Sequence, residues 1–148
     1  MIDRLIAASR FRAAFACMRQ LGLGFLDMAW HSVTEPITAS PEQVEREAFA
    51  QAPSAPHIDG CLMSVQFSHI FAGGYAACYY GYKWAEVLDA DVFERFVDDG
   101  VFNRETARQF RQLILSRGGT EAPMTLYLRF MGREPRIDAL LRRDGVGE

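Results

Sequence analysis

Four tyrosines stand close together in the middle of the chain, directly after a pair of glycines. Three of them, Tyr75, Tyr79 and Tyr82, follow the spacing i, i+4 and i+7, which places their side chains on one face of a helix. A phenol has an ordinary pKa of about 10, so at neutral pH it donates a hydrogen bond without carrying a charge. Such donors stabilise an oxyanion, and loss of one typically costs about 10²–10³ in rate. The alternative is core packing, which is the commoner role of an aromatic stripe.

Two further residue types accompany the tyrosines. Gly73 and Gly74 permit backbone angles that other residues avoid, so they could act as a hinge that moves the phenols. His69 lies just before the glycines among apolar neighbours, where a single histidine is more often structural than catalytic. His31 follows an aromatic helix end, and its simplest role is to cap that end. The residue types alone leave both the catalytic and the structural interpretation open.

Metal-binding and phosphate-binding motifs are missing from the sequence. It contains no His-Glu-x-x-His, no Gly-x-Gly-x-x-Gly and no P-loop. Its three cysteines, Cys17, Cys61 and Cys78, have no metal-ligand spacing, and their odd number fits a reducing compartment better than a disulfide framework. We therefore expect this chain to bind no metal by itself.

Length and composition indicate an ordinary globular domain. The chain has 148 residues, of which 49% are hydrophobic and 24% charged, and its net charge is -3. This charge gives no general attraction to nucleic acid or anionic lipid. No stretch approaches the roughly 20 apolar residues that cross a bilayer. We expect one domain over residues 1–148, with no nucleic-acid or membrane partner and a cytoplasmic location.

The elements that must position the tyrosines all have helical patterns, and the predicted fold class is all-α. Helices are expected over residues 2–31, 41–51, 75–98, from 104 to Gly118, 123–132 and from Pro135 onward. Gly22 and Gly24 weaken the first helix and indicate a break or a close helix contact. We expect the acidic residues of the long helix to form its solvated face: Glu86, Asp89, Asp91, Glu94, Asp98 and Asp99.

Local signals mark several helix ends. Ser40 is a good N-cap, Pro41 suits the first helical position, and Gln43 completes a capping box. Asn103 is expected to cap a later helix in the same way. The Pro-rich segment between residues 52 and 60 is expected to be an extended linker.

The segment "FSHIFAGGYAACYYGYKWAEVLDADVFERF" resembles the glycine-tyrosine loop and following helix of the thimet oligopeptidase family of zinc metallopeptidases. The segments "GVFNRETARQFRQLILSRGGTEAPM" and "GREPRIDALL" continue the resemblance toward the carboxyl end. Among the branches of the family, the chain is most similar to bacterial oligopeptidase A, and the peptidyl-dipeptidases are a close second.

The resemblance implies a role for each residue of this region. Tyr82, helped by Tyr75, would stabilise the tetrahedral oxyanion of peptide hydrolysis, and His69 would contact the substrate or transition state. Tyr79 would lie on the same substrate-binding loop, which Gly73 and Gly74 would keep mobile.

The resemblance also implies that the chain is a carboxyl-terminal portion of such an enzyme. The zinc ion would be held by residues upstream of the region that this chain represents. The implied substrates are short peptides, and the implied partners are the amino-terminal part of the peptidase or a second copy of the chain. Two alternatives stay open, a non-catalytic helical module for peptide binding or assembly, and an unrelated helical domain whose tyrosines are core.

Overall fold

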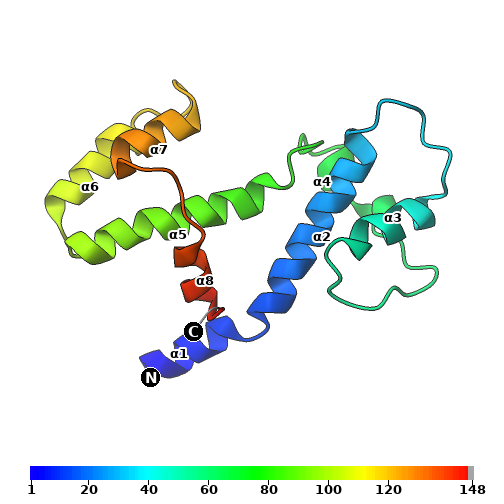
Figure 1. Ribbon diagram of the computed structural model, residues 1–148, viewed down its shortest axis with the longest axis horizontal. Helices are drawn as coiled ribbons and strands as arrows, with labels where there is room; N and C mark the ends of the chain where they lie inside the picture. The colour runs from blue at the N-terminus through cyan, green and yellow to red at the C-terminus, as the bar shows by residue number, and fades with distance from the viewer. Residues whose placement is uncertain (147–148) are drawn as a thin grey trace. The chain divides into compact units, whose positions relative to one another are not determined.

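The computed structural model describes residues 1–146, and within them all regular structure is helical (Figure 1). The prediction of an all-α fold is confirmed. The α-helices are α1 (Ile2–Arg10), α2 (Ala13–His31), α3 (Pro41–Ala50), α4 (Ser68–Phe71), α5 (Gly81–Asp99), α6 (Arg104–Phe110), α7 (Pro123–Met131) and α8 (Asp138–Asp144). A short 3-10 helix covers Ser64–Gln66, and a π-helical turn, Arg111–Leu115, extends α6.

The chain divides into two compact units, which we describe separately. The first unit covers Met1–Trp84, and the second begins at Ala85, so the boundary falls inside α5. That residues 1–148 form one domain stays a prediction.

The first predicted helix is interrupted, although not at its glycines. Phe11 is extended, and Arg12 takes a left-handed conformation with φ 60°, which separates α1 from α2. The prediction of one continuous helix over residues 2–31 is therefore wrong. None of the residues of α1 is buried.

Gly22 lies inside α2 and allows a close approach of α3. A Cβ atom on Gly22 would lie 3.0 Å from Cδ1 of Phe49, so a larger residue would require the Phe49 side chain to shift. Of the two expectations for this position, the close helix contact is confirmed and the break is wrong.

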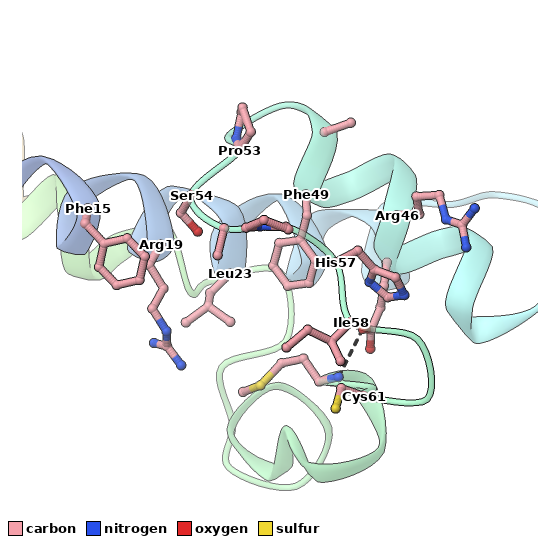
Figure 2. Close-up of a pocket in the computed structure, with 15 residues that line it drawn as sticks. Phe15, Arg19, Leu23, Arg46, Phe49, Pro53, Ser54, His57, Ile58 and Cys61 are labelled. Atoms are coloured by element: carbon pink, nitrogen blue, oxygen red, sulfur yellow. Dashed lines mark hydrogen bonds between the residues drawn. The ribbon is translucent and has the colours of Figure 1, made fainter.

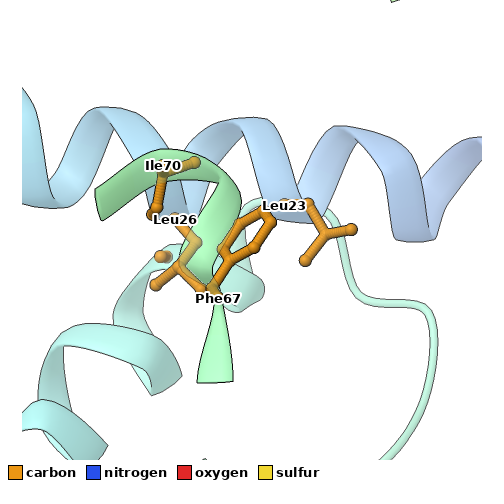
Figure 3. Packing of buried hydrophobic residues seen from close by; sticks show 5 residues of the cluster. Leu23, Leu26, Phe67 and Ile70 are labelled. Carbon is orange, nitrogen blue, oxygen red and sulfur yellow. The ribbon is translucent and has the colours of Figure 1, made fainter. Parts of the chain in front are cut away.

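A small hydrophobic core joins α2, α3 and α4 in the first unit. It consists of Leu23, Leu26, Ala48, Phe67 and Ile70, all of them buried. Figure 3 shows Phe67 and Ile70 lying against α2 beside Leu23 and Leu26. This core fixes the four-residue helix α4, which carries His69, to the much longer α2.

The start of α3 follows its local sequence only in part. The Ser40 hydroxyl accepts a hydrogen bond from the backbone N–H of Gln43 at 3.3 Å, and Pro41 occupies the first helical position, both as predicted. The Gln43 side chain, however, donates to Glu47 at 2.9 Å. The reciprocal half of the predicted capping box is therefore wrong.

Helix ends in the second unit also follow local signals. Asn103 caps α6 by accepting from the N–H groups of Glu105 and Thr106. The helix α5 ends at Asp99, before Gly100 with φ 97°. Pro123 begins α7, and Gly132, with φ 71°, ends it. These ends were predicted from the sequence.

Two expectations for the second unit are wrong. Asp91 is 2% exposed, so it is not part of a solvated face. Its carboxylate accepts hydrogen bonds from Tyr127, from Arg133 and from the backbone N–H of Arg136. The last helix begins at Asp138 and not at the predicted Pro135.

Among residues 1–146, no helix is both long enough and apolar enough to cross a membrane.

Candidate functional site

The segment 75–82, which we call the tyrosine segment, is not a continuous helix. Residues 75–80 form turns, and α5 begins only at Gly81, so the predicted helix start at Tyr75 is wrong. Ala77 has φ 56°, in the left-handed region that side chains other than glycine rarely adopt. The N–H groups of Ala77 and Tyr79 donate to the carboxylate of Asp27, a residue of α2. The spacing of residues within the segment gives no sign of these two long-range hydrogen bonds.

The three predicted tyrosine rings nevertheless come together. Tyr75 and Tyr82 are stacked, with ring centroids 5.3 Å apart and ring planes 19° apart. Tyr79 meets Tyr82 edge to face at 5.1 Å. The ring of His69 lies 5.4 Å from that of Tyr75 and 6.3 Å from that of Tyr79. The turns thus gather the four side chains that the sequence singled out.

The rings differ in exposure. Tyr75 is 38% exposed and Tyr82 is 37% exposed, so core packing is the wrong interpretation for both. Tyr79 is half-buried, and its ring packs against the buried Phe67 at 5.0 Å. Tyr79 therefore fixes the group to the core, while Tyr75 and Tyr82 stand at the surface.

The Tyr82 hydroxyl has a raised pKa. The main cause is a hydrogen bond between the Tyr82 and Tyr75 side chains, and partial burial and the neighbouring phenols Tyr75 and Tyr79 act in the same direction. A hydrogen bond that raises the pKa of an acid stabilises its protonated form. The shift is away from neutral pH, where a phenol is already protonated, so Tyr82 is a neutral donor there.

The two glycines before the tyrosines are required for different reasons. A Cβ atom on Gly73 would lie 2.7 Å from the carbonyl oxygen of His69, closer than side chains tolerate. Gly74 has φ 78°, a conformation that favours glycine. A shallow pocket of about 350 Å³ opens here, lined by Ser68, His69, Ala72, Gly73 and Tyr75. That the glycines make the loop mobile stays a prediction.

Asp27 is a site residue that the sequence reasoning missed. Its side chain is 0% exposed, and its carboxylate accepts from the N–H of Ala77 at 2.9 Å and from the N–H of Tyr79 at 2.8 Å. The Nδ1 atom of His31 lies 2.8 Å from the same carboxylate, in addition to its place at the end of α2. One feature of the sequence could have indicated a buried, hydrogen-bonded Asp27: it is the single carboxylate in the apolar run "LGLGFLDMAWH", four residues before a histidine.

A larger pocket of about 570 Å³ lies elsewhere in the first unit (Figure 2). Phe15, Arg19 and Leu23 of α2 line it, together with Phe49 of α3 and residues of the segment 53–63. Glu45 closes part of this pocket and accepts a hydrogen bond from the N–H of Met63 at 3.0 Å. The tyrosine segment and His69 do not line this pocket.

Potential metal ligands do not gather in the part of the chain that the structure describes. Residues 1–146 contain no group of three or more His, Cys, Asp or Glu side chains that could hold a metal ion. A structural or catalytic zinc site needs at least three protein ligands. The described residues therefore do not fit a zinc ion.

Comparison with known proteins places the chain in a family. The family model "Peptidase family M3" matches residues 1–146. The chain is 44% identical to oligopeptidase A of Escherichia coli, over 99% of this chain and 22% of that protein. It is 43% identical to oligopeptidase A of Haemophilus influenzae, over 98% of this chain and 21% of that protein. It is 38% identical to dipeptidyl carboxypeptidase of Salmonella typhimurium, over 97% of this chain and 22% of that protein.

The matches cover only part of each relative. The chain spans about a fifth of their length and corresponds to their carboxyl-terminal part. The resemblance inferred from the glycine-tyrosine segment is confirmed, since the chain belongs to peptidase family M3.

Proposed function

We propose that this chain supplies the oxyanion-stabilising wall of an oligopeptidase A-like metallopeptidase that hydrolyses short peptides. The observation that carries the proposal is the stacked pair of Tyr75 and Tyr82, which are partly exposed and lie beside His69. Because Tyr75, Tyr82 and His69 are exposed, their hydroxyl and imidazole groups are open to a ligand.

The proposed chemistry uses neutral donors. When an amide is cleaved, its carbonyl oxygen becomes negatively charged in the tetrahedral intermediate, and a donor aimed at that oxygen stabilises the transition state more than the substrate. Tyr82 is protonated at neutral pH, as an ordinary phenol is, and the hydrogen bond with Tyr75 raises its pKa further. On substrate binding the single Tyr82 hydroxyl proton would turn from Tyr75 to the oxyanion, and Tyr75 would support the Tyr82 ring by stacking and add a second donor.

The neighbouring residues have supporting roles in the proposal. His69 would contact the substrate or transition state from α4, and Tyr79 would shape the wall behind the two donors. Gly73 and Gly74 would allow the segment to close on a bound peptide. Zinc, which the family resemblance implies, would have to be held by residues outside this chain, because the described residues do not fit a zinc site.

The test uses a chimeric enzyme in which this chain replaces the matching part of Escherichia coli oligopeptidase A. Tyr82→Phe removes only the donating hydroxyl and should lower kcat by about 10²–10³ with little change in KM. Tyr80→Phe is the matched control, because Tyr80 is a neighbouring, exposed tyrosine to which the proposal gives no role. An unchanged kcat for Tyr82→Phe, or an equal loss for both variants, would contradict the proposal.

One observation favours a second candidate function, a non-catalytic module for binding or assembly. The helix α1 buries none of its residues, and Ile2, Leu5 and Ile6 are exposed, as is Phe11 directly after it. Such an apolar surface favours association with another polypeptide or with a second copy. The test is sedimentation of the purified chain with and without Leu5→Glu. If this candidate function is correct, the substitution weakens association. The cytoplasmic location stays a prediction.

A further inference from the structure

We propose that Asp27 is a positioning residue that holds the tyrosine segment in the conformation that presents Tyr75 and Tyr82. This inference rests on the proposed function of those two tyrosines. It concerns a carboxylate of α2 that lies 50 residues or more from its partners in the sequence.

Both oxygens of the Asp27 carboxylate bind the backbone of the segment. Oδ1 accepts from the N–H of Ala77 at 2.9 Å, and Oδ2 accepts from the N–H of Tyr79 at 2.8 Å. The two donors are separated by one residue, so a single carboxylate fixes the backbone on both sides of Cys78. Hydrogen bonds to an ionised acceptor are stronger than those between neutral groups.

The conformation that Asp27 holds is one that the segment would not adopt alone. Ala77 has φ 56°, which L-residues other than glycine rarely adopt, and the segment has no helical or strand partner over residues 75–80. The Asp27 side chain is 0% exposed, and without these two donors Oδ1 would keep its contact with His31 Nδ1 at 2.8 Å while Oδ2 would lose the N–H of Tyr79. The carboxylate and the turn therefore depend on one another.

The backbone contact reaches the phenols through Tyr79. Asp27 fixes the N–H of Tyr79, whose ring packs on the buried Phe67 at 5.0 Å and meets Tyr82 at 5.1 Å. Tyr82 in turn stacks on Tyr75. If the backbone at residues 77–79 relaxes, the ring of Tyr79 moves, and the stacked pair loses the surface that supports it.

The same unit contains a matched control. Glu45 of α3 is 1% exposed, and its carboxylate also accepts from two backbone N–H groups, those of Met63 and Ser64. Glu45 thus resembles Asp27 in burial and in binding two backbone N–H groups, although Asp27 also lies beside His31, and Glu45 holds the segment before α4 instead of the tyrosine segment. Comparing substitutions at Asp27 and Glu45 therefore distinguishes a local effect on the tyrosine segment from a general loss of packing in the unit.

The first experiment measures amide hydrogen exchange in the full chain by NMR. Asp27→Asn should speed exchange at Ala77 and Tyr79 about tenfold or more while Met63 and Ser64 stay protected, and Glu45→Gln should give the opposite pattern. Unchanged exchange at Ala77 and Tyr79 in Asp27→Asn would overturn the proposal. Equal loss of protection at all four amides would also overturn it, because Asp27 would then stabilise the whole unit.

The second experiment uses the chimeric oligopeptidase. Asp27→Asn should lower kcat at least about tenfold with little change in KM, because misplaced donors weaken transition-state stabilisation more than substrate binding. Faster exchange without a fall in kcat would overturn the positioning role. The proposed function fails separately, through an unchanged kcat in Tyr82→Phe, so the two failures are distinguishable.

Discussion

The ring of Tyr75 lies stacked on the ring of Tyr82, with centroids 5.3 Å apart and planes 19° apart. Tyr75 belongs to the turns before α5, whereas Tyr82 belongs to the first turn of that helix. The stacking therefore joins an irregular segment to a regular one. It also places two hydroxyl groups close enough that a hydrogen bond between them raises the pKa of Tyr82.

The pKa of Tyr82 should fall when Tyr75 loses its hydroxyl group. The hydrogen bond with Tyr75 is the largest cause of the raised value, so Tyr75→Phe should return the pKa of Tyr82 toward the ordinary value of about 10. The measurement is a pH titration followed by NMR of ring-labelled tyrosine. Tyr80→Phe serves as the control and should leave the titration of Tyr82 in place. A pKa that stays the same or rises in Tyr75→Phe would contradict the assignment of this hydrogen bond.

Three glycine-to-alanine substitutions around the tyrosines should have three different effects. Gly73→Ala places a Cβ atom 2.7 Å from the His69 carbonyl oxygen, so the backbone of α4 must shift. Gly74→Ala meets no atom within 4 Å but has φ 78°, which costs about 1–2 kcal/mol. Gly81→Ala meets no atom and lies in α5, where alanine is favoured by up to about 1 kcal/mol.

Thermal unfolding and NMR together distinguish these three effects. Gly73→Ala and Gly74→Ala should both lower the unfolding temperature, and Gly73→Ala should shift the His69 resonances more. Gly81→Ala should leave the unfolding temperature unchanged or raise it. Equal shifts of His69 in the first two variants would show that the close approach of Gly73 is not what fixes α4.

The helix pattern and several helix ends could be predicted because their causes are local. Ser40, Asn103 and Pro123 act on backbone groups within a few residues, and each acts at the predicted position. The tyrosine segment could not be predicted in the same way. The helical spacing of the tyrosines correctly predicted which rings meet. The backbone conformation of the segment, however, depends on hydrogen bonds from its N–H groups to Asp27, which is distant in the sequence.

Asp91 gives the same lesson in the second unit. Its position among acidic residues of α5 is typical of a solvated face, and nothing nearby indicates its partners. Those partners are Tyr127, Arg133 and Arg136, all more than 30 residues away. Both errors concern a buried carboxylate with distant donors, which periodicity cannot reveal.

Zinc should be absent from the purified chain after dialysis. The described residues contain no group of three or more potential ligands, so any bound zinc would be held by one or two side chains and would be lost easily. The measurement is metal analysis by mass spectrometry, together with a fluorogenic peptide assay in the presence of added zinc. One equivalent of retained zinc, or zinc-dependent cleavage by this chain alone, would contradict the inference that the metal belongs to residues outside it.

Acid should weaken the second unit through Asp91. Burial alone would raise the pKa of this carboxyl, but hydrogen bonds from Arg133, Tyr127 and the Arg136 N–H lower it to about 2, against an ordinary value of about 3.9. Because the folded pKa lies below the unfolded one, Asp91 contributes stability that is present above about pH 4. This stability is lost as the pH falls toward about 2.

Asp91→Asn tests this contribution because it removes the charge at every pH. The lowered pKa of Asp91 corresponds to about 2 kcal/mol of stability at neutral pH, so Asp91→Asn should unfold at a lower urea concentration. The difference between Asp91→Asn and the unchanged chain should shrink between pH 4 and pH 2, where the natural carboxylate also becomes protonated. Glu105→Gln is the control: Arg108 lowers the pKa of Glu105 to about 2 as well, but both side chains are more than half exposed, and solvent screens the pair. An effect of Glu105→Gln as large as that of Asp91→Asn would contradict the assignment of acid sensitivity to the buried carboxylate.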